Sequence, residues 1–290
     1  SMANKYPRKG CCIVALIGHN QVLTNKERGV TAWFQAAEKE GWRIYVADET
    51  LQQDGFFVDE NQKNRHESYS GNRKINHGHL SDSMRYYRNQ GIENWVHFVM
   101  NNDHKKASDI AGQLDDEDRI LVSRSMDNAR EYVRAKRFGA ERMGVLASSG
   151  GKRLVGEGIY VIPKDKTQIP EWMLTSTDDI RSSNLLDSAV TEFKIQGLEI
   201  DYSIVCWDAD LRIANKIWES HRVHGKGWQN YNSFLIPRKN AYRVLLTRAR
   251  KGMVVYVPKG DLTGLDPSRN PEFYDPIYEY LIECGAVSID

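Results

Sequence analysis

The chain has 290 residues, and its 40 lysines and arginines almost balance its 39 aspartates and glutamates. Its length excludes a disulfide-stapled miniprotein, and a 40% hydrophobic content excludes an intrinsically disordered chain. The near-zero net charge excludes a protein coated with basic residues, but it is compatible with a single basic face.

In chain order, six apolar runs bounded by polar turns predict buried strands. These runs span residues 11–18, 42–47, 119–124, 142–148, 202–207 and 252–258. Amphipathic patterns predict helices at 29–40, 92–101, 126–137, 178–188, 239–250 and 274–284. Strands that are apolar throughout and alternate with helices predict an α/β fold, with a mostly parallel sheet covered by helices on both faces.

One long polar segment interrupts this alternation. Residues 52–80 are rich in Asn, His and Lys, which predicts a surface loop or insertion. It separates a small N-terminal piece, residues 1–51, from a main domain at residues 81–290.

The cysteines and the hydrophobicity pattern predict a cytoplasmic protein. The cysteines lack the spacing of a zinc site or of a disulfide framework, so we expect reduced thiols and no bound metal. No apolar run reaches the roughly 20 residues that cross a bilayer, and no signal peptide precedes the first run. We therefore expect no membrane contact.

Ligands of open parallel sheets usually bind at the carboxyl ends of the strands. The segment "ASSGGKR" (147–153) follows a predicted strand and offers Ser148, Ser149 and Lys152 at the start of a predicted helix, which is a plausible anion site. Asp208 and Asp210 also follow a strand, where they either cap a turn or bind a metal. The sequence contains no G-x-x-x-x-G-K-[ST] phosphate loop.

Two further segments carry charged or aromatic side chains. Arg243, Arg248 and Arg250 lie close together in "NAYRVLLTRARKG", where they form either a solvated helix face or a site that neutralises a phosphoryl group. Between residues 218 and 231, Trp218, Trp228 and Tyr231 interleave with basic residues. These aromatics either pack in the core or stack on nucleic-acid bases.

Several of these segments resemble the motifs of superfamily-one helicases. "TEFKIQGLEID" (191–201) and "NAYRVLLTRARKG" (240–252) resemble motifs V and VI, "LIGHNQ" (16–21) resembles motif III, and "LSDSMRYYR" (80–88) resembles motif IV. Nearly the whole chain is similar to the C-terminal portion of a bacterial, Schlafen-related family of DNA/RNA helicase proteins. The resemblance implies a second RecA-like lobe, preceded at residues 1–51 by a remnant of the first.

The resemblance also implies roles for individual residues. The residues that it implies for nucleotide binding and hydrolysis are Gln21, Arg85, Gln196, Gly197, Glu199 and Arg248. Gln21 and Arg85 would contact the terminal phosphate of ATP, Glu199 would lie near the ribose, and Arg248 would be the arginine finger. ATP and magnesium would be bound together with an upstream lobe that carries the phosphate loop, so we expect this chain alone to be inactive as an ATPase.

On the nucleic-acid side, the resemblance selects Thr191 and the "SSGGK" loop as contacts to single-stranded DNA or RNA, and the aromatic segment adds Trp228. Two other classes of function stay open. One is a nucleic-acid binding module without catalysis. The other is a metal-dependent enzyme, such as a nuclease, that uses Asp208, Asp210 and Glu199.

Overall fold

The computed structural model of the protein describes residues 12–15, 23, 29–52, 57, 60–76, 78, 91–163, 166 and 168–290. The chain divides into two units, one formed by residues 1–22 and 26–79 and the other by residues 23–25 and 80–290. In the described part of the chain, no helix is both long and apolar enough to cross a membrane.

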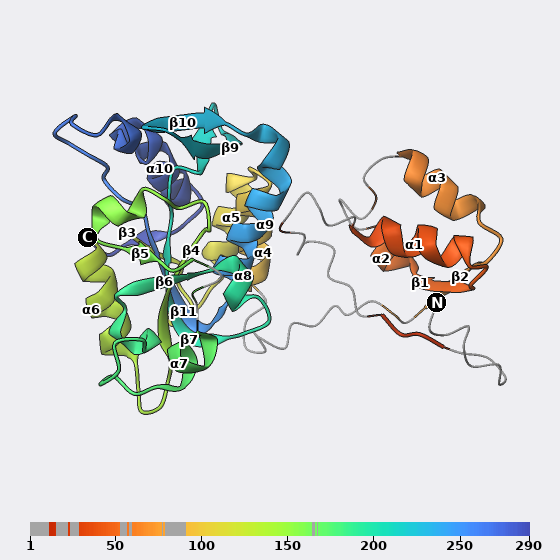
Figure 1. Ribbon diagram of the computed structural model, residues 1–290, viewed down its shortest axis with the longest axis horizontal. Helices are drawn as coiled ribbons and strands as arrows, with labels where there is room; N and C mark the ends of the chain where they lie inside the picture. The colour runs from red at the N-terminus through yellow and green to blue at the C-terminus, as the bar shows by residue number, and fades with distance from the viewer. Residues whose placement is uncertain are drawn as a thin grey trace. The chain divides into compact units, whose positions relative to one another are not determined.

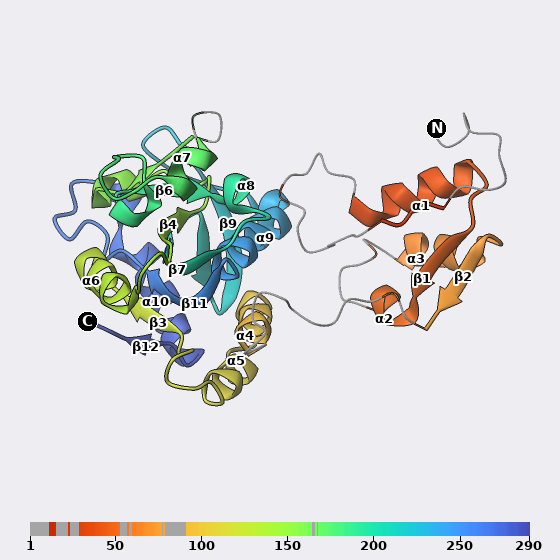
Figure 2. The same cartoon turned by 90° about the horizontal axis from the view of Figure 1, so that it is seen from below.

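Among its described residues, the first unit has helices packed with a pair of parallel strands, β1 and β2 (Figure 2). Its elements are α1 (Gly29–Lys39), β1 (Ile44–Ala47), α2 (Asp48–Leu51), α3 (Glu60–Ser68) and β2 (Asn72–Ile75). Phe34 of α1 is buried in a small hydrophobic cluster. The ring of His66 in α3 stacks on it with a centroid separation of 4.4 Å.

Two predictions for the N-terminal part of the chain differ from this arrangement. The expected loop or insertion at 52–80 contains α3 and β2. Both elements are polar on nearly every face and therefore give no periodic signal. The expected strand at 11–18 is not formed at residues 12–15, whose side chains are exposed, and its other residues lie outside the described ones. An apolar run becomes a strand only where another strand pairs with its backbone.

The second unit is built on a seven-stranded sheet in which every pairing is parallel, with the order β12-β3-β11-β7-β4-β6-β5. The strands are β3 (Leu121–Ser123), β4 (Met143–Ala147), β5 (Tyr160–Val161), β6 (Ser188–Thr191), β7 (Ile200–Cys206), β11 (Ala249–Tyr256) and β12 (Val287–Ser288). The predicted α/β fold class is confirmed.

Helices cover both faces of this sheet (Figures 1 and 2). One face carries α6 (Met126–Lys136), and the other carries α4 (Gly91–Met100), α5 (His104–Ala111), α9 (Leu235–Leu246) and α10 (Asp275–Glu283). Alternate residues of β11 enter the two cores: Val254 packs with α6, whereas Val255 packs with the helices of the other face. This two-sided burial explains why the central stretch of the strand, residues 253–256, is apolar.

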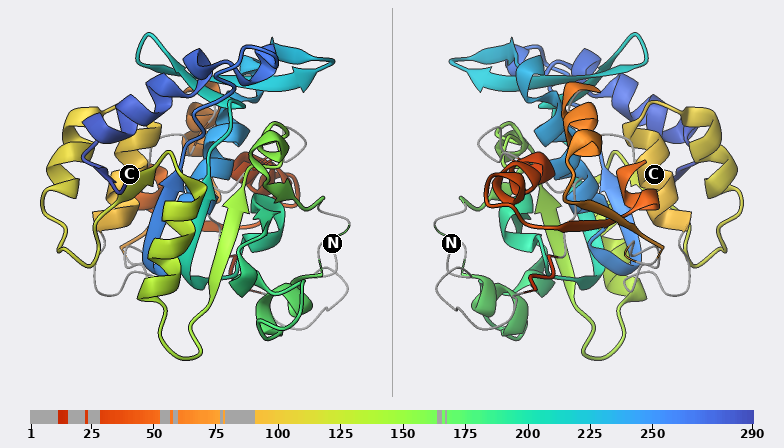
Figure 3. Two further views of the ribbon diagram at one scale, coloured as in Figure 1. Left: turned by 90° about the vertical axis from the view of Figure 1, so that its left-hand side faces the viewer. Right: turned by 90° about the vertical axis from the view of Figure 1, so that its right-hand side faces the viewer.

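A second, antiparallel sheet lies between β7 and α9 in the sequence. It consists of β8 (Leu211–Ala214), β9 (Ile217–His224) and β10 (Gly227–Asn230), in the order β10-β9-β8. Figure 3 shows β9 and β10 extending as a hairpin at one end of the unit. This sheet was not predicted from the sequence, because β8 and β10 have only four residues each and the longer β9 is not an apolar run.

Two of the predicted helices are corrected by the structure. Residues 178–187 form turns and a short 3₁₀ segment, η4 (Ser183–Leu185), and residue 188 begins β6. Asp179 accepts a hydrogen bond from the nearby amide of Arg181, which competes with a helix, and Asn184 accepts one from the distant amide of Met143. The helix predicted at 239–250 is α9, but it ends at Leu246 and the chain enters β11 at Ala249. The remaining helices are α7 (Ile169–Leu174) and α8 (Glu192–Ile195).

Candidate functional site

The "QGLE" segment forms the turn between α8 and β7. The backbone amide of Gln196 donates to Glu192 at 3.0 Å, and that of Leu198 donates to Ile195 at 2.9 Å. Gly197 has a φ of 87°, a left-handed conformation in which a side chain is strained. The glycine therefore ends α8 and directs the chain into β7.

Arg248 lies directly beside this turn. The backbone amide of Ile200 donates to the carbonyl of Arg248 at 3.1 Å, and Ile200 pairs with Ala249 across β7 and β11. The two motif-like segments are thus brought together, although they are about 50 residues apart in sequence. They meet at the amino ends of β7 and β11. In most parallel sheets, by contrast, ligands bind at the carboxyl ends of the strands.

The side chain of Arg248 is folded back onto α9 and is only 3% exposed. Its Nε donates to the carbonyl of Val244 at 2.8 Å, and its Nη2 donates to Thr247 Oγ1 at 3.0 Å. A cation at the C-terminus of a helix is favoured by the helix dipole. The guanidinium therefore caps the helix that precedes it.

The two neighbouring arginines have structural partners of their own. Arg243 donates to Asn240 at 2.8 Å and to Asn101 at 3.1 Å, which ties α9 to the end of α4. Arg250 pairs with Asp201 at 2.8 Å. These contacts give both residues a role in the fold.

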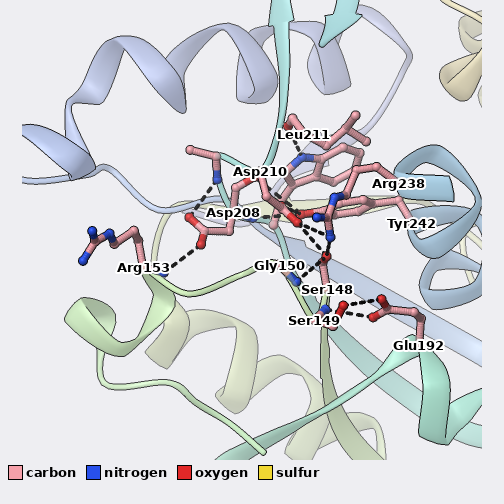
Figure 4. Close-up of polar contacts among 12 residues, drawn as sticks. Ser148, Ser149, Gly150, Arg153, Glu192, Asp208, Asp210, Leu211, Arg238 and Tyr242 are labelled. Carbon is pink, nitrogen blue, oxygen red and sulfur yellow. Dashed lines mark hydrogen bonds and ion pairs between the residues drawn. The ribbon is translucent and has the colours of Figure 1, made fainter. Parts of the chain in front are cut away.

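Three residues of the expected nucleic-acid surface lie together at the carboxyl ends of β4 and β6. Ala147 at the end of β4 is paired with Thr191 at the end of β6, so Ser148 and Ser149 lie next to the start of α8. The backbone amide and hydroxyl of Ser149 donate to the Glu192 carboxylate at 2.8 and 2.6 Å (Figure 4). Burial raises the pKa of Glu192.

The hydroxyl of Thr191 is buried and has no hydrogen-bond partner among the described residues. A buried polar atom without a partner is unfavourable for folding and calls for an explanation in terms of structure or function. This hydroxyl lies at the edge of the sheet where the resemblance places a nucleic-acid contact.

A buried polar network lies beside these serines (Figure 4). Asp210, which is fully buried, accepts hydrogen bonds from Ser148 Oγ at 2.6 Å and Tyr242 OH at 2.7 Å. It also forms an ion pair of 2.8 Å with Arg238. Arg238 and Tyr242 are one helical turn apart on α9, so this network joins the loop after β4 to α9.

The carboxylate of Asp208, like that of Asp210, is held by several hydrogen bonds. Its carboxylate accepts hydrogen bonds from Tyr274 OH at 2.9 Å and from the backbone amides of Ala209 at 2.7 Å and Arg153 at 2.9 Å. Burial and the neighbouring charge of Asp210 raise the pKa of Asp208 to about 6. Both aspartates therefore serve as internal acceptors of the fold.

The metal-dependent alternative finds no support in this geometry. Asp208 and Asp210 follow the carboxyl end of β7, and Glu199 precedes its amino end. The seven residues of the strand thus separate them by at least about 20 Å. Among the residues that the structure describes, no three His, Cys, Asp or Glu side chains are grouped so that they could hold a metal ion.

The other expected site residues are distributed as follows. Lys152 is exposed, and the segment that follows it is a four-residue 3₁₀ turn, η3 (Leu154–Glu157), instead of the predicted α-helix. Trp228 donates from Nε1 to the carbonyl of Ser268 at 2.7 Å and packs against the larger core. Trp218 is a core residue, only 1% exposed.

Gln21 and Arg85 lie outside the described residues, so their expected roles stay predictions. Sequence reasoning missed Glu192, Arg238 and Tyr242 as members of the polar network. The available signals were the position of Glu192 directly after Thr191 and the four-residue spacing of Arg238 and Tyr242 within a helical pattern.

The glycine turn and the arginine thus lie side by side at the amino ends of neighbouring strands, in a parallel sheet that helices cover on both faces. A family model described as Schlafen group 3, DNA/RNA helicase domain, matches residues 3–259, and the chain belongs to this family. The Schlafen-related identity expected from the motifs is confirmed.

Among solved structures, the C-terminal domain of a possible DNA helicase from Lactobacillus plantarum WCFS1 is similar to this chain. The two are 13% identical with a TM-score of 0.27, and the match covers 64% of this chain and 94% of that one. This likeness is too distant to support an argument about function. No curated protein matches the chain.

Proposed function

We propose that the chain is the second lobe of an ATP-dependent nucleic-acid helicase or translocase, in which Arg248 acts as the arginine finger. The hydrogen bond between the Ile200 amide and the Arg248 carbonyl carries this proposal, because it fixes the finger beside the "QGLE" turn. In the proposal, Glu199 lies near the ribose of ATP, and Gln196 and Gly197 border the same site.

The contacts of Arg248 suit a finger that is released when nucleotide binds. Its Nε donates to the last turn of α9 and its Nη2 to the residue after that helix. In the proposal, rotation about the bonds of this side chain turns the guanidinium toward the nucleotide. An arginine finger that stabilises the negative charge of a transferring phosphoryl group is worth about 10³ to 10⁵ in rate where it has been measured.

ATP and magnesium need a phosphate-binding loop, and the 290 residues contain no such motif. In the proposal, a lobe upstream of this one supplies it. The edge formed by Thr191, Ser148, Ser149 and Lys152 then contacts a single strand of DNA or RNA, with the exposed lysine facing a phosphate.

Binding of labelled single-stranded DNA and RNA to this chain, followed by fluorescence anisotropy at two salt concentrations, tests the nucleic-acid half. We expect affinity that falls as salt rises. The chain alone should not turn over ATP. Magnesium-dependent ATP turnover by the unaltered chain that disappears in an Arg248→Ala variant would contradict the proposed division between the lobes.

The finger itself is tested in a protein that joins a phosphate-loop lobe of the same family to this chain. Arg248→Lys should lower the nucleic-acid-stimulated ATPase rate about 1,000-fold. Arg250→Ala, which removes a half-exposed arginine two residues away, is the matched control and should leave the rate unchanged. Equal effects of the two substitutions would remove Arg248 from the mechanism.

A non-catalytic nucleic-acid binding module is the second candidate, and the buried, helix-capping position of Arg248 favours it. The two candidates differ in their response to nucleotide. In the joined protein, ATP with magnesium should change the affinity of a motor for single strands and leave that of a simple binding module unchanged.

A further inference from the structure

We propose that the β9–β10 hairpin and the turn after it form a stacking site for the bases of a single strand of nucleic acid, with Arg222 and Tyr231 as its centre. This inference rests on the proposed function, since it locates a contact for the strand that the lobe would bind. It also moves the contact away from Trp218 and Trp228, the tryptophans that the sequence had brought forward.

Four side chains form a stacked column at this place. The rings of Tyr231 and Phe234 are stacked with a centroid separation of 5.4 Å and an interplanar angle of 13°. The Arg222 guanidinium lies 4.7 Å from the Tyr231 ring centroid, and that of Arg238 lies 5.5 Å from the Phe234 ring centroid. The turn η5 (Asn232–Phe234) holds the two rings at this spacing.

The outer end of the column is fixed in place and faces solvent. Arg222 is exposed, yet its Nε and Nη2 both donate to Gln229 Oε1, at 3.1 and 2.9 Å, across the two strands of the hairpin. An exposed arginine normally loses side-chain entropy when it is ordered. Here the guanidinium is held over Tyr231 before any ligand arrives, and planar guanidinium groups stack well on bases.

The exposed charge of the hairpin is mainly positive. Residues 217–230 carry Arg222 and Lys226 against one carboxylate, Glu219, which contacts His221. The exposed hairpin side chains Arg222 and Lys226 belong to this stretch. A basic projection with planar groups suits a phosphate backbone that carries unpaired bases.

The hairpin is also hydrogen-bonded to the segment that follows Ser148 and Ser149. Arg153, which follows the "SSGGK" loop, donates from Nη2 to the carbonyl of Gly225 at the hairpin tip, at 3.2 Å. The tip and the loop that ends in the exposed Lys152 are therefore neighbours. A strand bound at the serine edge has a continuous basic path toward Arg222.

The aromatic pair contributes little to the core of the protein. Trp228 packs against the larger core, but Tyr231 and Phe234 are not among the described side chains that pack against either core. Tyr231, Phe234 and Arg222, unlike the buried Arg238, can therefore be replaced without emptying the core.

The test is the affinity of the 290-residue chain for a fluorescein-labelled single strand, compared with the same strand containing abasic sites. Tyr231→Ala and Arg222→Lys should each weaken binding of the intact strand about 5- to 150-fold, because each removes a planar group from the column. Both variants should lose the preference for the strand with bases. Tyr231→Phe keeps the ring and should bind like the unaltered chain, and thermal unfolding verifies that the variants fold.

Each outcome bears on one proposal or on both. Unaltered affinity and base preference in Tyr231→Ala would overturn the stacking site and leave the helicase-lobe proposal standing. Weak binding in Arg222→Ala with full binding in Arg222→Lys would show a simple charge contact and likewise overturn it. No binding by the unaltered chain, even at low salt, would overturn the stacking site together with the nucleic-acid half of the proposed function.

Discussion

Replacement of Asp210 by alanine should be among the most destabilising single changes in the second unit. Three donors converge on this buried carboxylate: the Ser148 hydroxyl, the Tyr242 hydroxyl and the Arg238 guanidinium. In Asp210→Ala the charge of Arg238, whose side chain is 7% exposed, is left without its carboxylate. The effect should therefore exceed that of losing an ordinary hydrogen bond.

The magnitude follows from these contacts. Removing one partner of a buried ion pair costs about 3 to 5 kcal/mol, against a total stability of about 5 to 15 kcal/mol for a typical domain. With a urea m-value of about 2 kcal/mol per molar, the unfolding midpoint should fall by about 2 M. The double variant Asp210→Ala with Arg238→Met should recover part of this loss, because it removes the uncompensated charge as well.

Urea unfolding followed by tryptophan fluorescence measures this effect, since buried Trp207 stacks on Tyr242 within the same network at 4.3 Å. Asp116→Ala is the matched control, because Asp116 is 84% exposed and forms its ion pair with Arg119 at the protein surface. It should leave the midpoint unchanged. A fall in Asp210→Ala no larger than in the control, or a double variant equal to the sum of the singles, would refute the coupling between Asp210 and Arg238.

Three further predictions concern neighbouring positions. Asp208 has a folded pKa of about 6 against an unfolded value near 4, so it contributes stability below about pH 4 that is lost as the pH rises to 6; Asp208→Asn should abolish this loss in urea titrations across that range. Gly150→Ala would place a methyl group against Arg238 and should cost about 1 to 3 kcal/mol by thermal unfolding, whereas Gly227→Ala, in open space, should be neutral. Gly197→Ala forces alanine into a left-handed conformation and should cost about 1 to 2 kcal/mol, measured as a lower urea midpoint.

The sequence predicted the strands β3, β4, β7 and β11, because their central residues are buried on both faces and form apolar runs. It did not predict β5, β6 and β12, which have only two to four residues each. It failed where local polarity hides structure. The helix α3 has no apolar side. Residues 178–188 carry a helical pattern, which is overridden by the local bond of Asp179 to the Arg181 amide and by the tertiary bond of Asn184 to the Met143 amide.

Only part of the candidate site could be predicted from the sequence. Motif resemblance placed Arg248 and the "QGLE" turn in one site, and the structure brings them side by side. The partners of Asp210 come from β4 and α9, and a contact between distant segments leaves no pattern in one sequence. Aromatic composition drew attention to Trp218, which the fold buries, while Phe234 gave no signal.

The helix α9 carries Arg238 in its first turn and is followed by Arg248 after its last. Its 12 residues span about 18 Å, from the carboxyl ends of the sheet strands to their amino ends. A packed helix moves as a stiff body, so a shift imposed at one end is transmitted to the other. The helix α9 therefore couples the two ends of the strands. While Asp210 holds Arg238, a displacement at the carboxyl ends is accompanied by a displacement at the amino ends.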